Sequence, residues 1–178
     1  MIRLFAAIEV PFDIGEGLTR RQQGLPRARW RPVEAFHITL RFFGEVTEAT
    51  AADLDSVLAG VSAAPFDLSL EGVGAFTEGD HARAVWAGVA ESEPLRRLAG
   101  KCESAAKRIG LRGEARVYRP HVTLAYLKGS PPDRIAAWVQ GHNLLRSPTW
   151  RVTDYHLYSS WSGPDGARYD IERTYPLI

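Results

Sequence analysis

A short pattern that could carry acid–base chemistry occurs twice in the chain: a histidine, any residue, a threonine and then a leucine. The two copies are His37-Ile38-Thr39-Leu40 and His121-Val122-Thr123-Leu124. Side chains two positions apart in a β-strand leave the same face, so each copy would present an imidazole and a hydroxyl together. Histidine exchanges protons near neutral pH, and a hydroxyl can donate a hydrogen bond to a phosphate oxygen. Two such strands facing one another would suit displacement at phosphorus, with a base beside the attacking water and an acid beside the departing oxygen.

A purely structural explanation of these histidines has to be weighed against the catalytic one. A histidine in an apolar strand is more often a hydrogen-bonded core residue than a catalyst, and threonine is common in strands. The other three histidines, His81, His142 and His156, lack the accompanying threonine, and we expect them to be surface or structural residues. The two motif copies occupy equivalent positions in the two halves of the chain, which favours the catalytic interpretation.

The segments around the two motifs repeat in the same order along the chain. His37 and His121 are 84 residues apart, and the same shift aligns Thr39 with Thr123. Further aligned pairs are Leu40 with Leu124, Phe42 with Tyr126 and Phe66 with Trp150. A helix and then a strand are expected after each motif. This order predicts an ancient duplication with a pseudo-two-fold axis, in which the two motif strands face each other across a cleft.

Hydrophobic periodicity and turn residues predict an α+β fold and not a doubly wound parallel sheet. We expect strands at 3–10, 36–43, 66–70, 82–90, 120–126, 150–160 and 167–175. We expect helices at 13–24, from Thr50 to Val61, at 93–109 and at 132–140. Thr50 and Asp53 resemble a capping box, and Gly110 can terminate the third helix.

Composition excludes several classes of protein. The chain has 178 residues and a formal net charge of +1, which argues against a broad basic surface for nucleic acid and predicts a local contact. Cys102 is the only cysteine, so a disulfide framework and a Cys-rich zinc site are excluded, and a reducing cytoplasm fits best. The apolar run after Met1 soon meets Glu9, which indicates a first strand and not an export signal. No stretch approaches the roughly 18 apolar residues of a membrane span.

The two motifs resemble the paired HxTx motifs of the 2H phosphoesterases. The flanking segments narrow this resemblance to the bacterial and archaeal branch known as RNA 2',3'-cyclic phosphodiesterase, formerly 2'-5' RNA ligase. The segments that carry it are Leu4–Ile8, Leu40–Val46, Val85–Gly88 and Arg119–His121. The likeness covers nearly the whole chain.

The resemblance implies a bilobal fold in which residues 1–178 form a single domain, with two antiparallel sheets lining a central cleft and helices outside. It implies an RNA-processing hydrolase that opens a 2',3'-cyclic phosphate to a 2'-phosphomonoester without a metal or cofactor. His37 would donate a proton to the O3' leaving group, and His121 would accept one from water. Thr39 and Thr123 would hold the phosphate. The expected partners are RNA ends or nucleotides with a 2',3'-cyclic phosphate, and we expect a cytoplasmic monomer that does not bind membranes.

One position departs from the pattern of the family. Many relatives carry arginine at the third position after the second threonine, where this chain has Tyr126. Arg41, Arg116 or Arg119 could supply the missing cation, and the sequence does not decide among them. The side chains predicted to bind substrate are Arg41, Phe42, Arg119 and Tyr126.

Phe42 is a candidate for base stacking, because an aromatic face accepts any base. Strict alternation would place it on the face away from His37, where it would be a core residue. A β-bulge between the two positions would bring it to the same face. Tyr126 has the same two possibilities, whereas Trp30 and Trp86 are predicted to be packing residues.

Two other functions remain open: an RNA-end binding module with little or no turnover, and a 2H phosphodiesterase acting on small cyclic nucleotides. A metal-dependent hydrolase has no support, because no HxxxH, HxD or HExxH pattern surrounds either histidine. The chain also lacks GxxxxGK[ST] and GxGxxG motifs, which argues against an ATP-dependent ligase.

Overall fold

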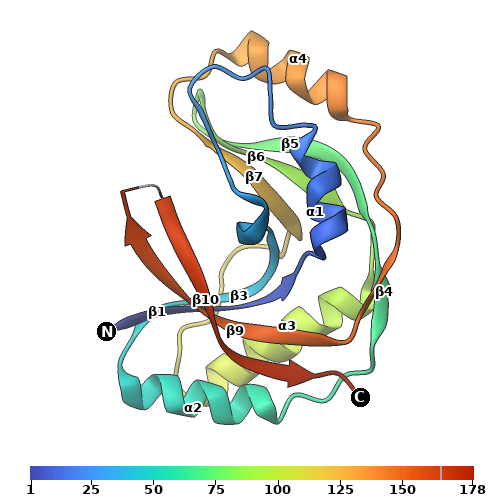
Figure 1. Cartoon of the computed structure of the whole chain (residues 1–178). Helices are drawn as coiled ribbons and strands as arrows, with labels where there is room; N and C mark the ends of the chain where they lie inside the picture. Colours follow the sequence, from blue (N-terminus) through green and yellow to red (C-terminus); the bar gives the residue numbers. More distant parts are fainter. Residues whose placement is uncertain (165) are drawn as a thin grey trace.

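Two four-stranded antiparallel sheets form the framework of the protein (Figure 1). The computed structural model describes residues 1–164 and 166–178. The lower sheet in Figure 1 has the strand order β10 (Gly166–Pro176), β9 (Asp154–Gly163), β1 (Ile2–Glu9) and β3 (His37–Val46). The upper sheet has the order β2 (Ala28–Trp30), β7 (His121–Leu127), β6 (His81–Val89) and β5 (Leu70–Glu78). The predicted α+β architecture with two antiparallel sheets is confirmed.

The helices pack on the outside of this framework (Figure 1). Helices α2 (Glu48–Ala59) and α3 (Glu93–Arg108) contact each other and the lower sheet, through β1 and β3 respectively. Helix α4 (Pro132–His142) packs on β5 of the upper sheet. Helix α1 (Phe12–Thr19) packs against the 3-10 turn η1 (Val33–Ala35), which leads directly into β3. No helix in the described ranges is long and apolar enough to cross a bilayer.

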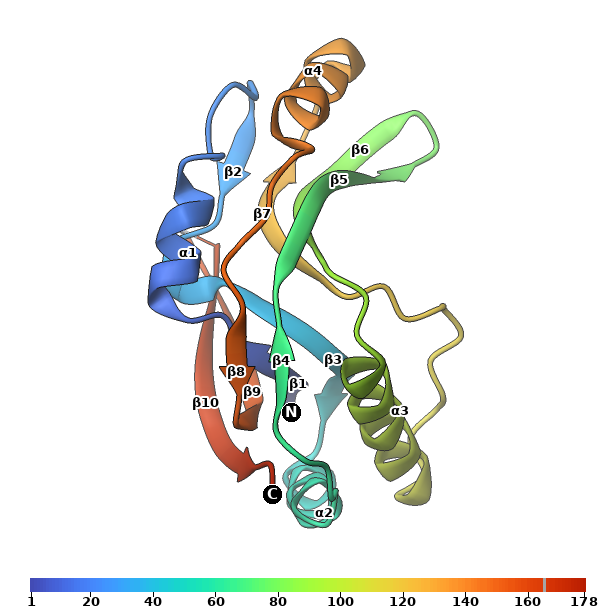
Figure 2. The same ribbon diagram turned by 90° about the vertical axis from the view of Figure 1, so that its right-hand side faces the viewer.

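A short pair of strands, β4 (Phe66–Leu68) and β8 (Trp150–Val152), lies between the two sheets (Figure 2). They are antiparallel, and the central partners are Asp67 and Arg151, which also form an ion pair of 3.3 Å. These two residues are 84 positions apart, as the two histidines are. A segment that pairs antiparallel with its own equivalent places a two-fold axis through the central pair. The register therefore supports the predicted pseudo-two-fold axis.

The two halves of the chain exchange strands after this crossing. β5 follows β4 and joins the sheet of β6 and β7, whereas β9 follows β8 and joins the sheet of β1 and β3. Each sheet thus contains strands from both halves, and the two histidine strands, β3 and β7, lie in contact.

Strand β1 is the N-terminal run of the chain and lies inside the lower sheet between β3 and β9. Its residues Leu4 to Ile8 are all buried, because both faces of the strand are covered. Leu4 and Ile8 belong to the main hydrophobic core, whereas Phe5 packs with Tyr158 on the opposite face. The prediction of a first strand at this position is confirmed.

Most of the predicted elements are confirmed, with differences at their ends. The strand expected at 82–90 is β6, and the helix expected at 93–109 is α3, after which Gly110 adopts a φ of 88°. Two helix boundaries were wrong. The helix expected to start at Thr50 starts at Glu48, because Thr47 is its cap and accepts a hydrogen bond from the Thr50 amide at 3.2 Å. The helix expected at 13–24 ends at Thr19 and continues only as a turn.

The strands after residue 66 differ most from prediction. The strand expected at 66–70 is two strands, β4 and β5, and the strand expected at 150–160 is likewise split into β8 and β9. The length of β5 was missed because its glycines interrupt the alternation of apolar residues. Gly74 is nevertheless suited to its place, because a Cβ there would lie 2.4 Å from the ring of Trp86.

Candidate active site

The two His-x-Thr motifs occupy equivalent places in the two sheets. His37 and Thr39 start β3, and both are half-buried, whereas the intervening Ile38 is fully buried in the core. The same alternation starts β7, where Val122 is buried between the half-buried His121 and Thr123. Burial of the apolar residues therefore directs each histidine and threonine to the other face of the strand, as the sequence predicted.

Each imidazole is held by the same backbone contact. His37 Nδ1 lies 2.8 Å from the carbonyl oxygen of Ala35, and His121 Nδ1 lies 2.7 Å from the carbonyl oxygen of Arg119. A carbonyl can only accept, so Nδ1 must carry the proton and donate it. Nε2 of each neutral ring is then the nitrogen that can gain and release a proton.

Burial affects the proton affinity of both rings. It lowers the pKa of His37 from 6.5 to about 4, although the hydrogen bond to Ala35 acts in the opposite direction. The positive charges of His121 and Arg31 lower the pKa of His37 further. Burial also lowers the pKa of His121, and the Arg119 carbonyl partly offsets that effect. Both imidazoles are therefore predominantly neutral at pH 7 in the empty site.

Aromatic rings fix the orientation of both histidines. The ring of His37 lies 4.9 Å from that of Phe5 on the neighbouring strand β1, and 5.1 Å from the edge-on ring of Tyr169 on β10. The ring of His121 lies 4.7 Å from that of Phe76, in an edge-to-face arrangement, and 6.3 Å from that of Trp86. These contacts restrict the rotation of each imidazole and support the packing role predicted for Trp86.

Thr39 and Thr123 differ in their main-chain contacts, but the side-chain hydroxyls of both are available to a ligand. The carbonyl of Thr39 accepts a hydrogen bond of 2.8 Å from the hydroxyl of Tyr118, which ties β3 to the segment before β7. Among the hydrogen bonds of the described residues, none uses the hydroxyl of Thr39 or Thr123. Both hydroxyls can thus donate to a ligand that lies between the strands.

A β-bulge follows each motif at the same position. Between β1 and β3, Ala7 pairs with Thr39 and Ala6 with Arg41, so Leu40 is the extra residue. Between β6 and β7, Trp86 pairs with Thr123 and Val85 with Ala125, so Leu124 is the extra residue. The two bulges are at equivalent positions of the two halves.

The bulges reverse the alternation of the residues that follow them. Phe42 is 39% exposed and Tyr126 is 48% exposed, whereas the next residue in each strand, Phe43 or Leu127, is buried. The ring of Phe42 stacks on that of Phe5 at 5.6 Å and 4°, and Phe5 in turn contacts His37. Phe42 therefore shares a face with His37, and the alternative in which it is a core residue is wrong.

The arginines proposed from the sequence are placed differently from one another. Arg41 forms an ion pair with Glu103 of α3 and donates to the carbonyl of Arg112 at 2.6 Å, which directs its guanidinium toward α3. The side chain of Arg41 thus lies against α3 and not among the aromatic rings around His37. The bulge at Leu40 places Phe42, and not Arg41, on the face of His37. Arg119 contacts His121 through its main-chain carbonyl, and its side chain is exposed. Arg116 is exposed and pairs with Glu114 at 3.6 Å.

A cation that sequence reasoning missed, Arg31, lies beside Tyr169, whose ring also contacts His37. Arg31 follows β2 and is only 7% exposed. Its guanidinium carbon lies 5.4 Å from the ring centre of Tyr169 and 5.8 Å from that of Tyr126. No motif marks this residue in the sequence, and its position depends on the pairing of β2 with β7.

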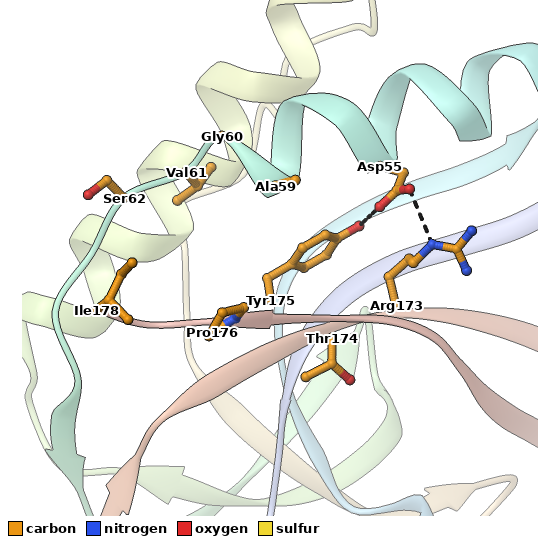
Figure 3. A pocket seen from close by; sticks show the side chains of 10 residues that line it. All are labelled: Asp55, Ala59, Gly60, Val61, Ser62, Arg173, Thr174, Tyr175, Pro176 and Ile178. Carbon is orange, nitrogen blue, oxygen red and sulfur yellow. Dashed lines mark hydrogen bonds and ion pairs between the residues drawn. The ribbon is translucent and has the colours of Figure 1, made fainter.

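A cavity elsewhere in the molecule is lined by neither His37 nor His121. It has a volume of about 440 Å³ and lies between the end of α2 and β10 (Figure 3). Its carboxylate, Asp55, accepts a hydrogen bond of 2.8 Å from the Tyr175 hydroxyl and pairs with Arg173 at 3.2 Å. The charged groups of this cavity, Asp55 and Arg173, therefore neutralise each other.

The remaining histidines do not join the two motifs. His156 is buried and its Nδ1 lies 2.9 Å from the Thr174 hydroxyl, whereas His81 is exposed and His142 lies at the end of α4. Within the part of the chain that the structure describes, no group of three His, Cys, Asp or Glu side chains could hold a metal ion.

Comparison with known proteins adds independent information. The model of a protein family described as the 2'-5' RNA ligase superfamily matches residues 12–163. A protein of Archaeoglobus fulgidus named RNA 2',3'-cyclic phosphodiesterase is 32% identical over 177 residues, which are 98% of this chain and 99% of that protein.

Two solved structures resemble the fold over almost its whole length. TT0787 of Thermus thermophilus superimposes with a TM-score of 0.83 at 24% identity, covering 98% of this chain and 97% of that one. E. coli LigT, solved in complex with 3'-AMP, superimposes with a TM-score of 0.81 at 25% identity, covering 99% of this chain and 98% of that one.

Proposed function

The chain belongs to the 2'-5' RNA ligase superfamily, and from this membership we propose that it is a hydrolase that opens RNA 2',3'-cyclic phosphate ends. The observation that carries the proposal is the paired arrangement of His37 and His121, each held through Nδ1 with Nε2 left for proton transfer. The A. fulgidus protein that carries this activity in its name is similar over 98% of the chain.

In the proposed mechanism the two histidines act on opposite sides of phosphorus. His121 Nε2 takes a proton from water as the water oxygen forms its bond to phosphorus. The bond between phosphorus and O3' breaks, and O3' takes the proton that His37 Nε2 carries. The product is a 2'-phosphomonoester with a free 3'-hydroxyl, and each histidine ends with the protonation state that the other had. The hydroxyls of Thr39 and Thr123 donate to the equatorial oxygens, where negative charge is held through the transition state.

The low pKa of His37 fits the role of proton donor only when substrate is bound. When His37 is neutral, its Nε2 carries no proton to give to O3', and burial holds the pKa of His37 near 4 in the empty site. A phosphate anion beside the ring favours the imidazolium and raises that pKa. Binding of the substrate thus protonates the acid at the point where it is needed.

The exposed ring of Phe42 is the proposed platform for a nucleobase. It lies on the same face of the sheet as His37, because both rings contact Phe5. The guanidinium carbon of Arg3 lies 5.2 Å from the centre of the Phe42 ring. Tyr126 occupies the equivalent position in the other sheet and is the second aromatic side chain proposed to contact substrate. The E. coli structure with 3'-AMP supports a nucleotide site in this fold.

We also propose that the protein works as a monomer in the cytoplasm, as a single domain formed by residues 1–178. The two histidines come from one chain, so the site needs no second copy.

The test is incubation of the purified protein with a short RNA that ends in a 2',3'-cyclic phosphate, with and without excess chelator. The position of the product phosphate is assigned against synthetic 2'- and 3'-phosphate standards, and His37→Ala is the matched control. We expect a 2'-phosphate at the same rate in both conditions. Stoichiometric binding without product would establish an RNA-end binding module instead. Loss of turnover in chelator that zinc or manganese restores would contradict the two-histidine mechanism, and a 3'-phosphate would contradict the proposed orientation of the substrate.

A further inference from the structure

Arg31 is a buried cation held between the two sheets. Its amide donates to the carbonyl of Leu124 at 2.8 Å, which fixes its main chain beside the second motif. One guanidinium nitrogen donates to the carbonyl of Ala167 on β10, also at 2.8 Å. The side chain therefore spans from the β7 side of the molecule to β10 of the opposite sheet.

The guanidinium lies among the aromatic groups of the site. Tyr169 contacts both Arg31 and His37, since its ring lies 5.4 Å from the guanidinium carbon and 5.1 Å from the imidazole. The charge of Arg31 reaches the imidazole, because it contributes to the lowered pKa of His37.

Arg31 lies against Tyr126, an exposed residue of the second motif strand. The ring centre of Tyr126 is 5.8 Å from the guanidinium carbon of Arg31. A cation at position 126 would project from β7, next to β2. In this chain the cation beside that position comes from the residue that follows β2.

We propose that Arg31 binds an anionic phosphate oxygen of the substrate, supplying a positive charge from the end of β2 beside Tyr126. The inference rests on the proposed function. A guanidinium has five N–H donors, and the Ala167 carbonyl engages only one of its nitrogens. Hydrogen bonds from a guanidinium to a phosphate are charge-assisted and about twice as strong as neutral ones.

The central experiment moves the cation from one strand to the other. Arg31→Gln should lower kcat/KM by about 10- to 100-fold, as expected for loss of one charge-assisted contact. Arg31→Lys should retain more activity than Arg31→Gln, and adding Tyr126→Arg to Arg31→Gln should recover most of the loss. The control is Arg134→Gln on the exposed surface of α4, which removes the same charge and should leave kcat/KM unchanged.

A structural role for Arg31 gives a different pattern. If Arg31 only ties β10 to the other sheet, the loss should follow the fall in melting temperature, and Tyr126→Arg should recover none of it. That result, or an Arg31→Gln enzyme with full kcat/KM, would overturn the inference.

Two substrates distinguish the phosphate that Arg31 contacts. A mononucleotide 2',3'-cyclic phosphate carries only the cyclic phosphate, whereas a dinucleotide also carries a 5' phosphodiester. An equal loss on both assigns Arg31 to the cyclic phosphate, and a loss confined to the dinucleotide assigns it to the phosphodiester.

A binding measurement tests the contact of Arg31 even if the protein is not the proposed hydrolase. If the wild-type protein turns over neither substrate, the affinity for adenosine 2'-monophosphate replaces kcat/KM as the readout. Weaker binding by Arg31→Gln and unchanged binding by Arg134→Gln would then support the phosphate contact alone, and equal binding by both variants would overturn it.

Discussion

The two histidines are held by equivalent bonds but lie in different surroundings. Tyr169 and the charge of Arg31 lie near His37, whereas Trp86 packs beside His121. Burial lowers the pKa of His37 to about 4, and the charges of His121 and Arg31 lower it further. Burial also lowers the pKa of His121. The protonation of the proposed donor therefore depends on the charge of the substrate.

Replacement of either histidine tests the acid–base pair directly. His37→Ala or His121→Ala should lower kcat by about 10²- to 10⁴-fold, because each removes one proton transfer. The double variant should lose less than the product of the two single losses, since acid and base act in one displacement. Binding of adenosine 2'-monophosphate should suffer less than turnover. Full activity in either single variant would exclude the two-histidine mechanism.

The same variants can separate the acid from the base. A cyclic substrate whose bridging 3' atom is sulfur releases a thiolate, which needs no proton. It should restore the activity of His37→Ala much more than that of His121→Ala. Equal recovery in both variants would contradict the assignment of roles.

The lowered pKa of His37 should be visible in NMR titrations and in stability. We expect its ring to titrate near pH 4 in the empty protein and at higher pH with adenosine 2'-monophosphate bound. Between about pH 6.5 and pH 4 the unfolded chain binds this proton and the folded protein does not, so stability falls as the pH drops through that range. His37→Gln should therefore lose less stability than the wild type over the same interval. Titration of His37 at or above 6.5 in the empty protein would contradict this expectation.

At the scale of secondary structure, the two bulges decide which side chains reach the site. Leu40 and Leu124 complete the two motifs, and each is the extra residue of its strand. Each is also fully or almost fully buried, so the apolar residue that fills the core is the one that breaks the ladder. The break turns Phe42 and Tyr126 outward.

Phe42 should contribute to the affinity for a base and not to chemistry. Phe42→Ala should raise KM for a dinucleotide by about 5- to 150-fold, because stacking of one base contributes roughly 1–3 kcal/mol. The value of kcat should change little, and Phe42→Tyr should keep the affinity. The matched control is Phe12→Ala, which removes an exposed ring on α1. An unchanged KM in Phe42→Ala would remove Phe42 from the substrate site.

Packing of β5 against β6 supports His121 through Trp86. Gly74→Ala would place a Cβ 2.4 Å from the Trp86 ring, so we expect a loss of about 1–3 kcal/mol in the free energy of unfolding and reduced turnover. Gly100→Ala on α3 is the control, because nothing lies within 4 Å of its added Cβ. It should stabilise the protein by about 0.5–1 kcal/mol. Denaturant titration gives the free energy of unfolding of both variants. Equal changes in the two would contradict this prediction.

For the whole molecule, the exchange of strands links the two halves. Each sheet takes strands from both, and β4 and β8 pair where the chain crosses from one sheet to the other. Neither sheet is complete with one half of the chain alone. The site formed by β3 and β7 thus depends on both halves of the chain.

This exchange predicts that the protein unfolds in one step. Calorimetric and van 't Hoff enthalpies should agree, and far-UV circular dichroism and tryptophan fluorescence should report the same midpoint. The midpoint should not depend on protein concentration if the protein is a monomer. Two separate transitions would show that the sheets are independent domains.

The sequence by itself determined which residues form the two motifs, which face of the strand they share, and the duplication of the motif. Alternation placed His37 and Thr39 on one face and Ile38 on the other, and the shift of 84 residues related them to His121 and Thr123, because these patterns depend only on neighbouring positions. Alternation along the strand could not predict on which face of the sheet Phe42 lies, because a β-bulge depends on how the strands pair. It also could not find Arg31, whose guanidinium reaches the site only through contacts with β7 and β10. Only the tertiary structure brings residues so distant in the chain together.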